Sequence, residues 1–271
     1  MTGNPTDVPS QVPGGPVPSS EEGRWLLHLV KVMARLRAPG GCPWDREQTH
    51  RTLARHLLEE AHELIDAIDR DDSDAIRDEL GDLLLQVVFH AEMASEDGRW
   101  DVDDVARRLV EKLVHRHPHV FGDLEVSGAD EVLTNWERLK AEESGGRSGV
   151  DEGIPSTLPA LARAAKVQRR AAGWGVEWPS RGAAVAALRD EVAELSGDAD
   201  DAEREVGAVL FATVAAARKL GVDAESALRR TTREFAERYE RAAAEAGDRG
   251  LVRAHLDEHE VRRLFRGART D

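Results

Sequence analysis

Residues 78–85 read DELGDLLL, and the apolar run continues through QVVF to Phe89. Apolar side chains fall on almost every side of a helix drawn through this segment, so the pattern predicts a buried helix over about 74–96. Glu79 and Asp82 lie three residues apart on one face of that helix. Two neighbouring carboxylates in an apolar frame repel each other and are costly to bury unless they share a cation. The segment therefore indicates a bound cation.

Helical periodicity extends along most of the chain. Apolar residues recur at steps of three and four, and no segment alternates convincingly in the way that a strand does. Ala, Leu, Glu and Arg dominate, and aromatic residues make up only 4%, which is a helix-forming composition. We therefore predict an all-α protein with helices at about 25–37, 50–70, 74–96, 102–116, 130–143, 158–172, 182–196, 201–220, 223–246 and 256–266.

An internal repeat connects two parts of the sequence. Residues 204–211 (REVGAVLF) resemble residues 78–85, and residues 190–195 (DEVAEL) resemble residues 59–64 (EEAHEL). Such a repeat predicts two tandem copies of one helical unit. Ala208 stands in the second copy where Asp82 stands in the first, so we expect the second copy to be degenerate.

The local residue composition suggests where the domains begin and end. Residues 1–21 hold five of the 11 prolines among Gly and Ser, which is typical of a disordered tail. The predicted organisation is this tail, a first helical domain over 22–143 that carries the full set of acids, a linker over 144–157 and a degenerate second domain over 158–271.

A second acidic group precedes the apolar helix. Glu59, Glu60 and Glu63 lie at positions i, i+1 and i+4, so they share roughly a quarter of a helix circumference. Alone, such a run is most often a solvated helix face. Together with Glu79 and Asp82 it predicts an all-oxygen metal site, which suits Mg²⁺, or Mn²⁺ in its place, better than zinc.

Charge and cysteine content exclude several classes of partner. The chain of 271 residues has 37 Lys and Arg against 52 Asp and Glu, a formal net charge of −15 that disfavours nucleic acid. No apolar run approaches the roughly 20 residues that span a bilayer, and no secretory signal is recognisable. The single cysteine, Cys42, cannot form an internal disulfide, which favours the cytoplasm.

The predicted metal suggests the ligand. Mg²⁺ is usually shared between a few carboxylates and substrate phosphates, so a triphosphate is the expected partner. Lys112 and Arg116 form an i, i+4 pair that would bind it, although a basic helix C-terminus also explains them. Trp136 is a candidate for stacking on a base, with Trp44 in the same pocket, although core packing is the commoner role of tryptophan. Glu234 replaces Lys112 in the second copy.

These residues resemble the MazG family of nucleoside triphosphate pyrophosphohydrolases over about residues 25–265. The motifs that carry the resemblance are GCPWD (41–45), EExxE (59–63), ExxD (79–82), RHPHVF (116–121) and IPSTLPAL (154–161). The resemblance implies all-α units paired into homodimers, Mg²⁺ dependence, and cleavage between the α and β phosphates to a nucleoside monophosphate and pyrophosphate.

Site roles carry over from the resemblance residue by residue. It implies metal ligands at Glu60, Glu63, Glu79 and Asp82, with Glu59 adjoining them. It also implies phosphate contacts at Lys112 and Arg116 and a base contact at Trp136. Some two-copy relatives use the second copy for catalysis, but Ala208 and Glu234 place the expected activity of this chain in the first copy.

The mechanistic hypothesis is that Glu59 orients or deprotonates a metal-bound water, which attacks the α phosphorus. Such an enzyme would serve nucleotide-pool housecleaning. Two alternatives remain at this point. Glu59 and His62 form one ExxH pair, as a di-iron carboxylate protein requires, but Asp82 stands where such a site needs a further histidine. The acidic helices would also suit a non-enzymatic regulatory module that binds a partner protein.

Overall fold

The structure of the chain is a computed structural model. It describes residues 23–128, 131–132, 135–136, 139, 149–195, 201–251 and 257–268. The expected tail at 1–21, most of the helix expected at 130–143 and the first part of the expected linker lie outside the described residues.

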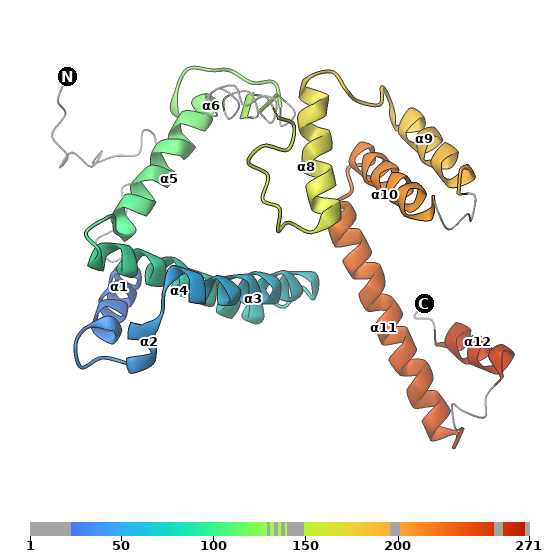
Figure 1. The fold of residues 1–271 in the computed structure, drawn as a ribbon, viewed down its shortest axis with the longest axis horizontal. Helices are drawn as coiled ribbons and strands as arrows, with labels where there is room; N and C mark the ends of the chain where they lie inside the picture. Colours follow the sequence, from blue (N-terminus) through green and yellow to red (C-terminus); the bar gives the residue numbers. More distant parts are fainter. Residues whose placement is uncertain are drawn as a thin grey trace. The chain divides into compact units, whose positions relative to one another are not determined.

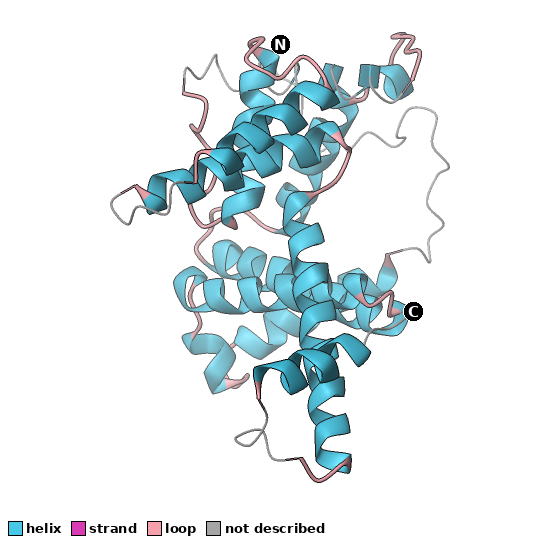
Figure 2. Cartoon of the chain, turned by 90° about the vertical axis from the view of Figure 1, so that its right-hand side faces the viewer, coloured by secondary structure: helices cyan, strands magenta, loops and turns pink. Residues whose placement is uncertain are grey.

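Every regular element in these described ranges is a helix (Figures 1 and 2), so the prediction of an all-α protein is confirmed. The helices are α1 (Arg24–Arg37), α2 (Pro43–Glu47), α3 (His50–Asp69), α4 (Ser73–Glu96), α5 (Val102–Arg116), α6 (Pro118–Phe121), α8 (Ala160–Gly173), α9 (Arg181–Ala193), α10 (Ala202–Lys219), α11 (Ala224–Asp248) and α12 (Glu258–Gly267). None of them is long and apolar enough to cross a bilayer.

The chain divides into two compact units, 1–146 and 147–271. The long helices of the first unit agree with the predicted ranges within one or two residues. The short helices α2 and α6 were not predicted, because a segment of four or five residues shows no helical period. That the two units are copies of one another stays a prediction.

In the first unit α3 and α4 form an antiparallel hairpin. Thr49 caps α3 by accepting a hydrogen bond from the Thr52 backbone N–H at 3.2 Å, and Asp72 caps α4 in the same way through Ala75 at 3.1 Å. The turn between the helices holds Asp71 in a left-handed conformation with φ 55°, a region that Asp tolerates better than most residues.

The core of this unit lies where α1 crosses the hairpin. It consists of Met33, Leu53, Val88, Phe89 and Met93. All buried residues of α4 belong to its C-terminal half, where the core side chains of α1 and α3 pack against it.

The prediction that α4 is buried all round is wrong, mainly for its N-terminal half. Leu80 and Leu84 in that half are 51% and 40% exposed, and Val87, just past the middle of the helix, is 42% exposed. The reason is that α1 and α5 pack on the other half of the helix, so one apolar face near the acids has no cover within the described chain.

The loop from α1 to α3 is fastened by Arg37. Its guanidinium forms two hydrogen bonds with Glu96 at the end of α4, at 2.7 and 2.8 Å, and donates to the backbone carbonyls of Asp45 and Gln48. Gly41 is required in this loop because a Cβ there would lie 2.1 Å from the Leu36 carbonyl oxygen. Arg37 thus ties the GCPWD segment and the backbone before α3 to the end of α4.

The second unit has its own packing. α10 packs against α8, α9 and α11, and α12 packs on α11. Gln168 of α8 is buried and donates to the Phe211 carbonyl at 2.8 Å. Glu177, in the loop after α8, pairs with Arg218 and Lys219 at the end of α10, at 3.1 and 2.9 Å. These contacts tie the α8–α9 connection to α10.

Candidate active site

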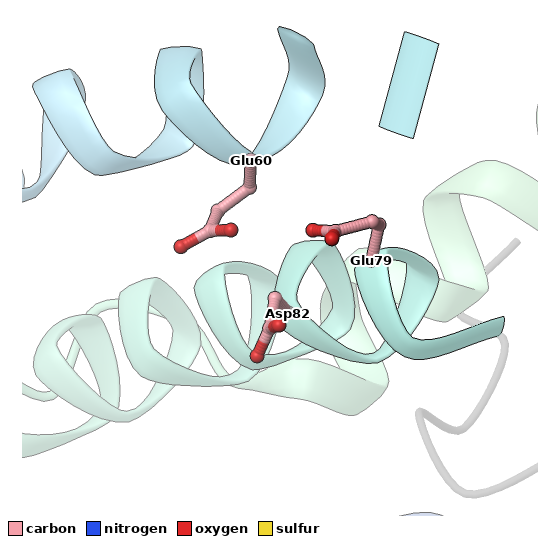
Figure 3. Close-up of side chains that lie close together, drawn as sticks. All are labelled: Glu60, Glu79 and Asp82. Carbon is pink, nitrogen blue, oxygen red and sulfur yellow. The ribbon is translucent and has the colours of Figure 1, made fainter. Parts of the chain in front are cut away.

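Three carboxylates meet on the α3–α4 hairpin. Each of Glu60, Glu79 and Asp82 offers an oxygen, and the three oxygens lie within 4.8 Å of one another. Figure 3 shows Glu60 projecting from one helix towards Glu79 and Asp82 on the other. Glu60 stands nine residues before the end of α3 and Asp82 nine residues after the start of α4. The antiparallel hairpin therefore brings them to the same level.

The environment of Glu60 and Glu79 opposes the ionisation of these two carboxyl groups. Burial is the main cause that raises the pKa of Glu60, followed by the charges of Asp82, Glu63 and Glu79, while His56 lowers it. Burial and then the charge of Glu63 raise the pKa of Glu79, with a further contribution from Asp82. The cluster therefore repels itself when its acids are ionised.

A bound divalent cation fits this donor set. The Oε2 atom of Glu79 is covered by its neighbours and has no hydrogen-bond partner among the described residues. A cation would satisfy this oxygen and reverse the repulsion among the three acids. Oxygen-only ligands suit Mg²⁺ or Mn²⁺. Within the described part of the chain, no other group of three or more potential metal ligands lies as close together.

The other two acids of the EExxE motif are placed differently. Glu63 is exposed and lies outside the 4.8 Å group, although its charge raises the pKa of both Glu60 and Glu79. Glu59 pairs instead with His56, whose Nδ1 lies 3.0 Å from Glu59 Oε2. His62, which the di-iron alternative requires, is exposed and is not part of the group.

Sequence reasoning missed His56. Arg55 donates to His56 Nε2 at 3.2 Å, so the proton of a neutral His56 ring is on Nδ1 and is donated to Glu59. Trp44 is half-exposed and contacts the His56 ring edge to face, with 6.2 Å between the ring centroids. The i, i+3 spacing of His56 and Glu59 was the signal that could have found the pair.

The predicted phosphate and base contacts lie on α5 and beyond it. The Arg116 guanidinium lies over the Trp136 ring, 5.3 Å from its centroid, and His117 meets the same ring edge-on at 5.0 Å. Lys112 is exposed on α5. The structure thus brings Arg116 and Trp136 together.

The basic residues are not brought to the carboxylates within one chain. Figure 1 shows α5 leaving the C-terminal end of α4, whereas Asp82 lies about 20 Å along the axis from that end. The metal cluster and the Lys112–Arg116 pair are therefore separate features of a single copy.

The second unit keeps acids but forms no such group in its described residues. Glu205, in the position that corresponds to Glu79, is buried beside Arg204, with 3.8 Å between the charged groups. Ala208 takes the position of Asp82.

The helical fold and this cluster define a class of protein: an all-α protein with a candidate carboxylate site for a divalent cation. Residues 48–121, which carry the cluster and the Lys112–Arg116 pair, match the family described as the MazG nucleotide pyrophosphohydrolase domain.

Full-length relatives agree with this match. The chain is 44% identical over 240 residues to the nucleoside triphosphate pyrophosphohydrolase of Escherichia coli (strain K12). The aligned region covers 84% of this chain and 91% of that protein. It is 42% identical over 239 residues to the nucleoside triphosphate pyrophosphohydrolase/pyrophosphatase MazG of Thermotoga maritima, covering 87% and 92% of the two chains. The chain belongs to the MazG family, as its motifs predicted.

Proposed function

We propose that the chain hydrolyses nucleoside triphosphates between the α and β phosphates, giving a nucleoside monophosphate and pyrophosphate in a Mg²⁺-dependent reaction. The observation that carries the proposal is the three-carboxylate cluster with the unpartnered Glu79 Oε2, in a chain that belongs to the MazG family. We also propose a role in nucleotide-pool housecleaning and a cytoplasmic location. The free thiol of Cys42 is consistent with that reducing compartment.

The metal ligands in this proposal are Glu60, Glu79 and Asp82, with Glu63 as the fourth. Glu63 is close enough to affect the pKa of two of the others. A divalent cation held there supplies positive charge to the triphosphate oxygens and lowers the pKa of water.

Glu59 is the proposed base. The contact with His56 Nδ1 engages Glu59 Oε2, so the second oxygen of the same carboxylate accepts a proton from the attacking water. The oxygen of that water forms the new bond to the α phosphorus, and the bond from this phosphorus to the α–β bridging oxygen breaks. Pyrophosphate leaves with the electron pair of that bond.

Lys112 and Arg116 are the proposed partners of the leaving pyrophosphate, and Trp136 and Trp44 the proposed base contacts. Because the basic pair lies away from the carboxylates of its own chain, a complete site requires a second copy. We therefore propose a homodimer. The exposed Leu80, Leu84 and Val87 on α4, beside the cluster, support this assembly.

Product analysis tests the proposal. The purified full chain is incubated with canonical and damaged NTPs and dNTPs and Mg²⁺ in H₂¹⁸O, and the products are separated. We expect a monophosphate that carries ¹⁸O together with unlabelled pyrophosphate. Release of a diphosphate and inorganic phosphate would contradict the proposal. Failure of every nucleotide to react would favour the alternative of a non-enzymatic partner-binding module.

A further inference from the structure

Two histidines join the other end of the α3–α4 hairpin. His50 is the first residue of α3, and His90 lies in the C-terminal half of α4. Their Nδ1 atoms are 2.7 Å apart, and their ring planes differ by 1°. The ring centroids are 5.0 Å apart, so the two nitrogens must lie between the ring centres. The rings therefore meet edge to edge in one plane, as a direct hydrogen bond requires.

The neighbours of the pair fix its protons. Arg99 donates to His50 Nε2 at 3.0 Å, so that nitrogen is an acceptor and a neutral His50 carries its proton on Nδ1. His50 Nδ1–H then donates to His90 Nδ1, which places the His90 proton on Nε2. An additional proton on either ring breaks one of these two bonds.

The pair lies on the same two helices as the metal cluster. His50 and Glu60 are separated by about 15 Å along the axis of α3, and His90 and Asp82 by about 12 Å along the axis of α4. A hydrogen bond at this level opposes sliding of one helix along the other, and such sliding would separate Glu60 from Glu79 and Asp82.

We propose that His50 and His90 form a proton-sensitive clamp that fixes the register of α3 on α4 and so positions Glu60 against Glu79 and Asp82. Both are positioning residues. The effect of the clamp on turnover rests on the proposed function, whereas its effect on the carboxylate cluster does not.

Burial and the neighbouring His50 ring define the direction of the pH effect, in a setting where the nearby charges are paired. Arg99 is paired with Asp97 in the loop after α4. Arg37 of α1, which reaches the backbone before α3, is paired with Glu96, and Glu92 lies between His90 and Glu96 on α4. Burial, followed by His50, lowers the pKa of His90 from its ordinary value of 6.5. The unfolded chain therefore takes up the proton first, so the stability that the clamp contributes begins to fall below pH 6.5. The hydrogen bond in the folded protein breaks only at a lower pH, when the folded His90 ring is itself protonated.

The first test reads the protons directly. Nitrogen-detected NMR of the ¹⁵N-histidine-labelled full chain at pH 8 should show His50 protonated on Nδ1 and His90 on Nε2. Any other pair of tautomers would overturn the proposal. This measurement needs neither metal nor substrate.

The second test uses variants of His90 and the affinity for Mn²⁺, measured by electron paramagnetic resonance. His90→Asn keeps an acceptor oxygen near the place of Nδ1 but cannot titrate, whereas His90→Phe removes the acceptor. At pH 8 we expect His90→Asn to bind Mn²⁺ as tightly as the wild type and His90→Phe to bind it about fivefold more weakly. A fivefold change in affinity corresponds to the loss of one ordinary hydrogen bond. At pH 5, well below the ordinary pKa of histidine, the wild type should bind more weakly than His90→Asn. Because the two share every carboxylate, this difference isolates the clamp.

The control is His28→Asn, which removes an exposed histidine of α1 that contacts the Trp25 ring. It should follow the wild type at both pH values. Equal Mn²⁺ affinities for the wild type, His90→Asn and His90→Phe at both pH values would overturn the clamp. If the wild type releases no pyrophosphate but the Mn²⁺ differences are found, the proposed function fails and the clamp stands.

Discussion

Glu60 of α3 and Asp82 of α4 place carboxylate oxygens within 4.8 Å of one another, across two antiparallel helices. Burial and then the charge of Asp82 raise the pKa of Glu60. Glu79 completes the group with a covered oxygen that has no hydrogen-bond partner in the described chain. This relationship suits a protein that gains its final stability and its chemistry from a divalent cation.

Neutral amides at the cluster should abolish activity. Asp82→Asn and Glu79→Gln each remove a charged ligand, and we expect Mg²⁺-dependent pyrophosphate release to fall by at least about a hundredfold. The control is Asp74→Asn, an exposed acid on α4 that pairs with Arg77. Near wild-type turnover in both cluster variants would show that Asp82 and Glu79 are not part of the active site.

The same substitution should have opposite effects with and without metal. In EDTA, Asp82→Asn relieves repulsion on Glu60 and Glu79, so its midpoint of thermal unfolding should equal or exceed that of the wild type. Mg²⁺ at one hundred times its dissociation constant should stabilise the wild type by about 2.7 kcal/mol and leave the variant unchanged. Differential scanning calorimetry measures the unfolding midpoints in EDTA and the stabilisation by Mg²⁺ for the two proteins. Equal stabilisation of the two proteins by Mg²⁺ would show that the cation binds elsewhere.

A charge on the exposed face of α4 should separate the proposed dimer. Leu84 is 40% exposed beside the cluster, and Leu84→Glu should weaken self-association by at least about a hundredfold. Size-exclusion chromatography with light scattering measures the molar mass, which should fall from that of a dimer to that of a monomer. Pyrophosphate release should decrease at the same time. Val32→Glu, at an exposed site on α1, is the matched control. If Leu84→Glu remains a dimer, the dimer interface does not lie on this face of α4.

The buried guanidinium of Arg37 should matter for stability. Its side chain is 8% exposed and pairs with Glu96 while donating to two backbone carbonyls. Arg37→Met leaves these acceptors without a donor and should lower the free energy of unfolding by about 2–3 kcal/mol. Arg35→Met, on the exposed side of α1, should change it by less than about 0.5 kcal/mol. Urea titration compares the two variants, and similar values would show that the Arg37 contacts contribute little.

Acid should weaken the second unit through Glu177. The hydrogen bond from Lys219 is the main cause that lowers the pKa of Glu177 below 4.5, with Arg218 adding to it. A lowered pKa in the folded state gives stability that is complete above pH 4.5 and is lost as the pH falls below that value. At pH 7, Glu177→Gln should reduce the free energy of unfolding by about 1 kcal/mol. The difference from the wild type should shrink at pH 3; a constant difference at both pH values would contradict the ion pair.

The helices and the acids were predictable because both depend on local sequence. Periodic apolar residues located α3, α4 and α5, and the spacing of Glu79 and Asp82 placed them on one face. The local spacing of His56 and Glu59 offered a similar signal, but the His50–His90 pair was not predictable in the same way. Residues 40 positions apart become neighbours only when the hairpin closes.

The long helices, the family membership and the residues that can supply an all-oxygen site all follow from the amino-acid sequence. The packing of the helices brings Glu60, Glu79 and Asp82 together, while Glu59 pairs with His56. It also directs α5, which carries Lys112 and Arg116, away from the C-terminal end of α4 (Figure 1). The physical reason is that helical periodicity sets the face on which a side chain lies, whereas the turn and the packing of whole helices set which faces meet.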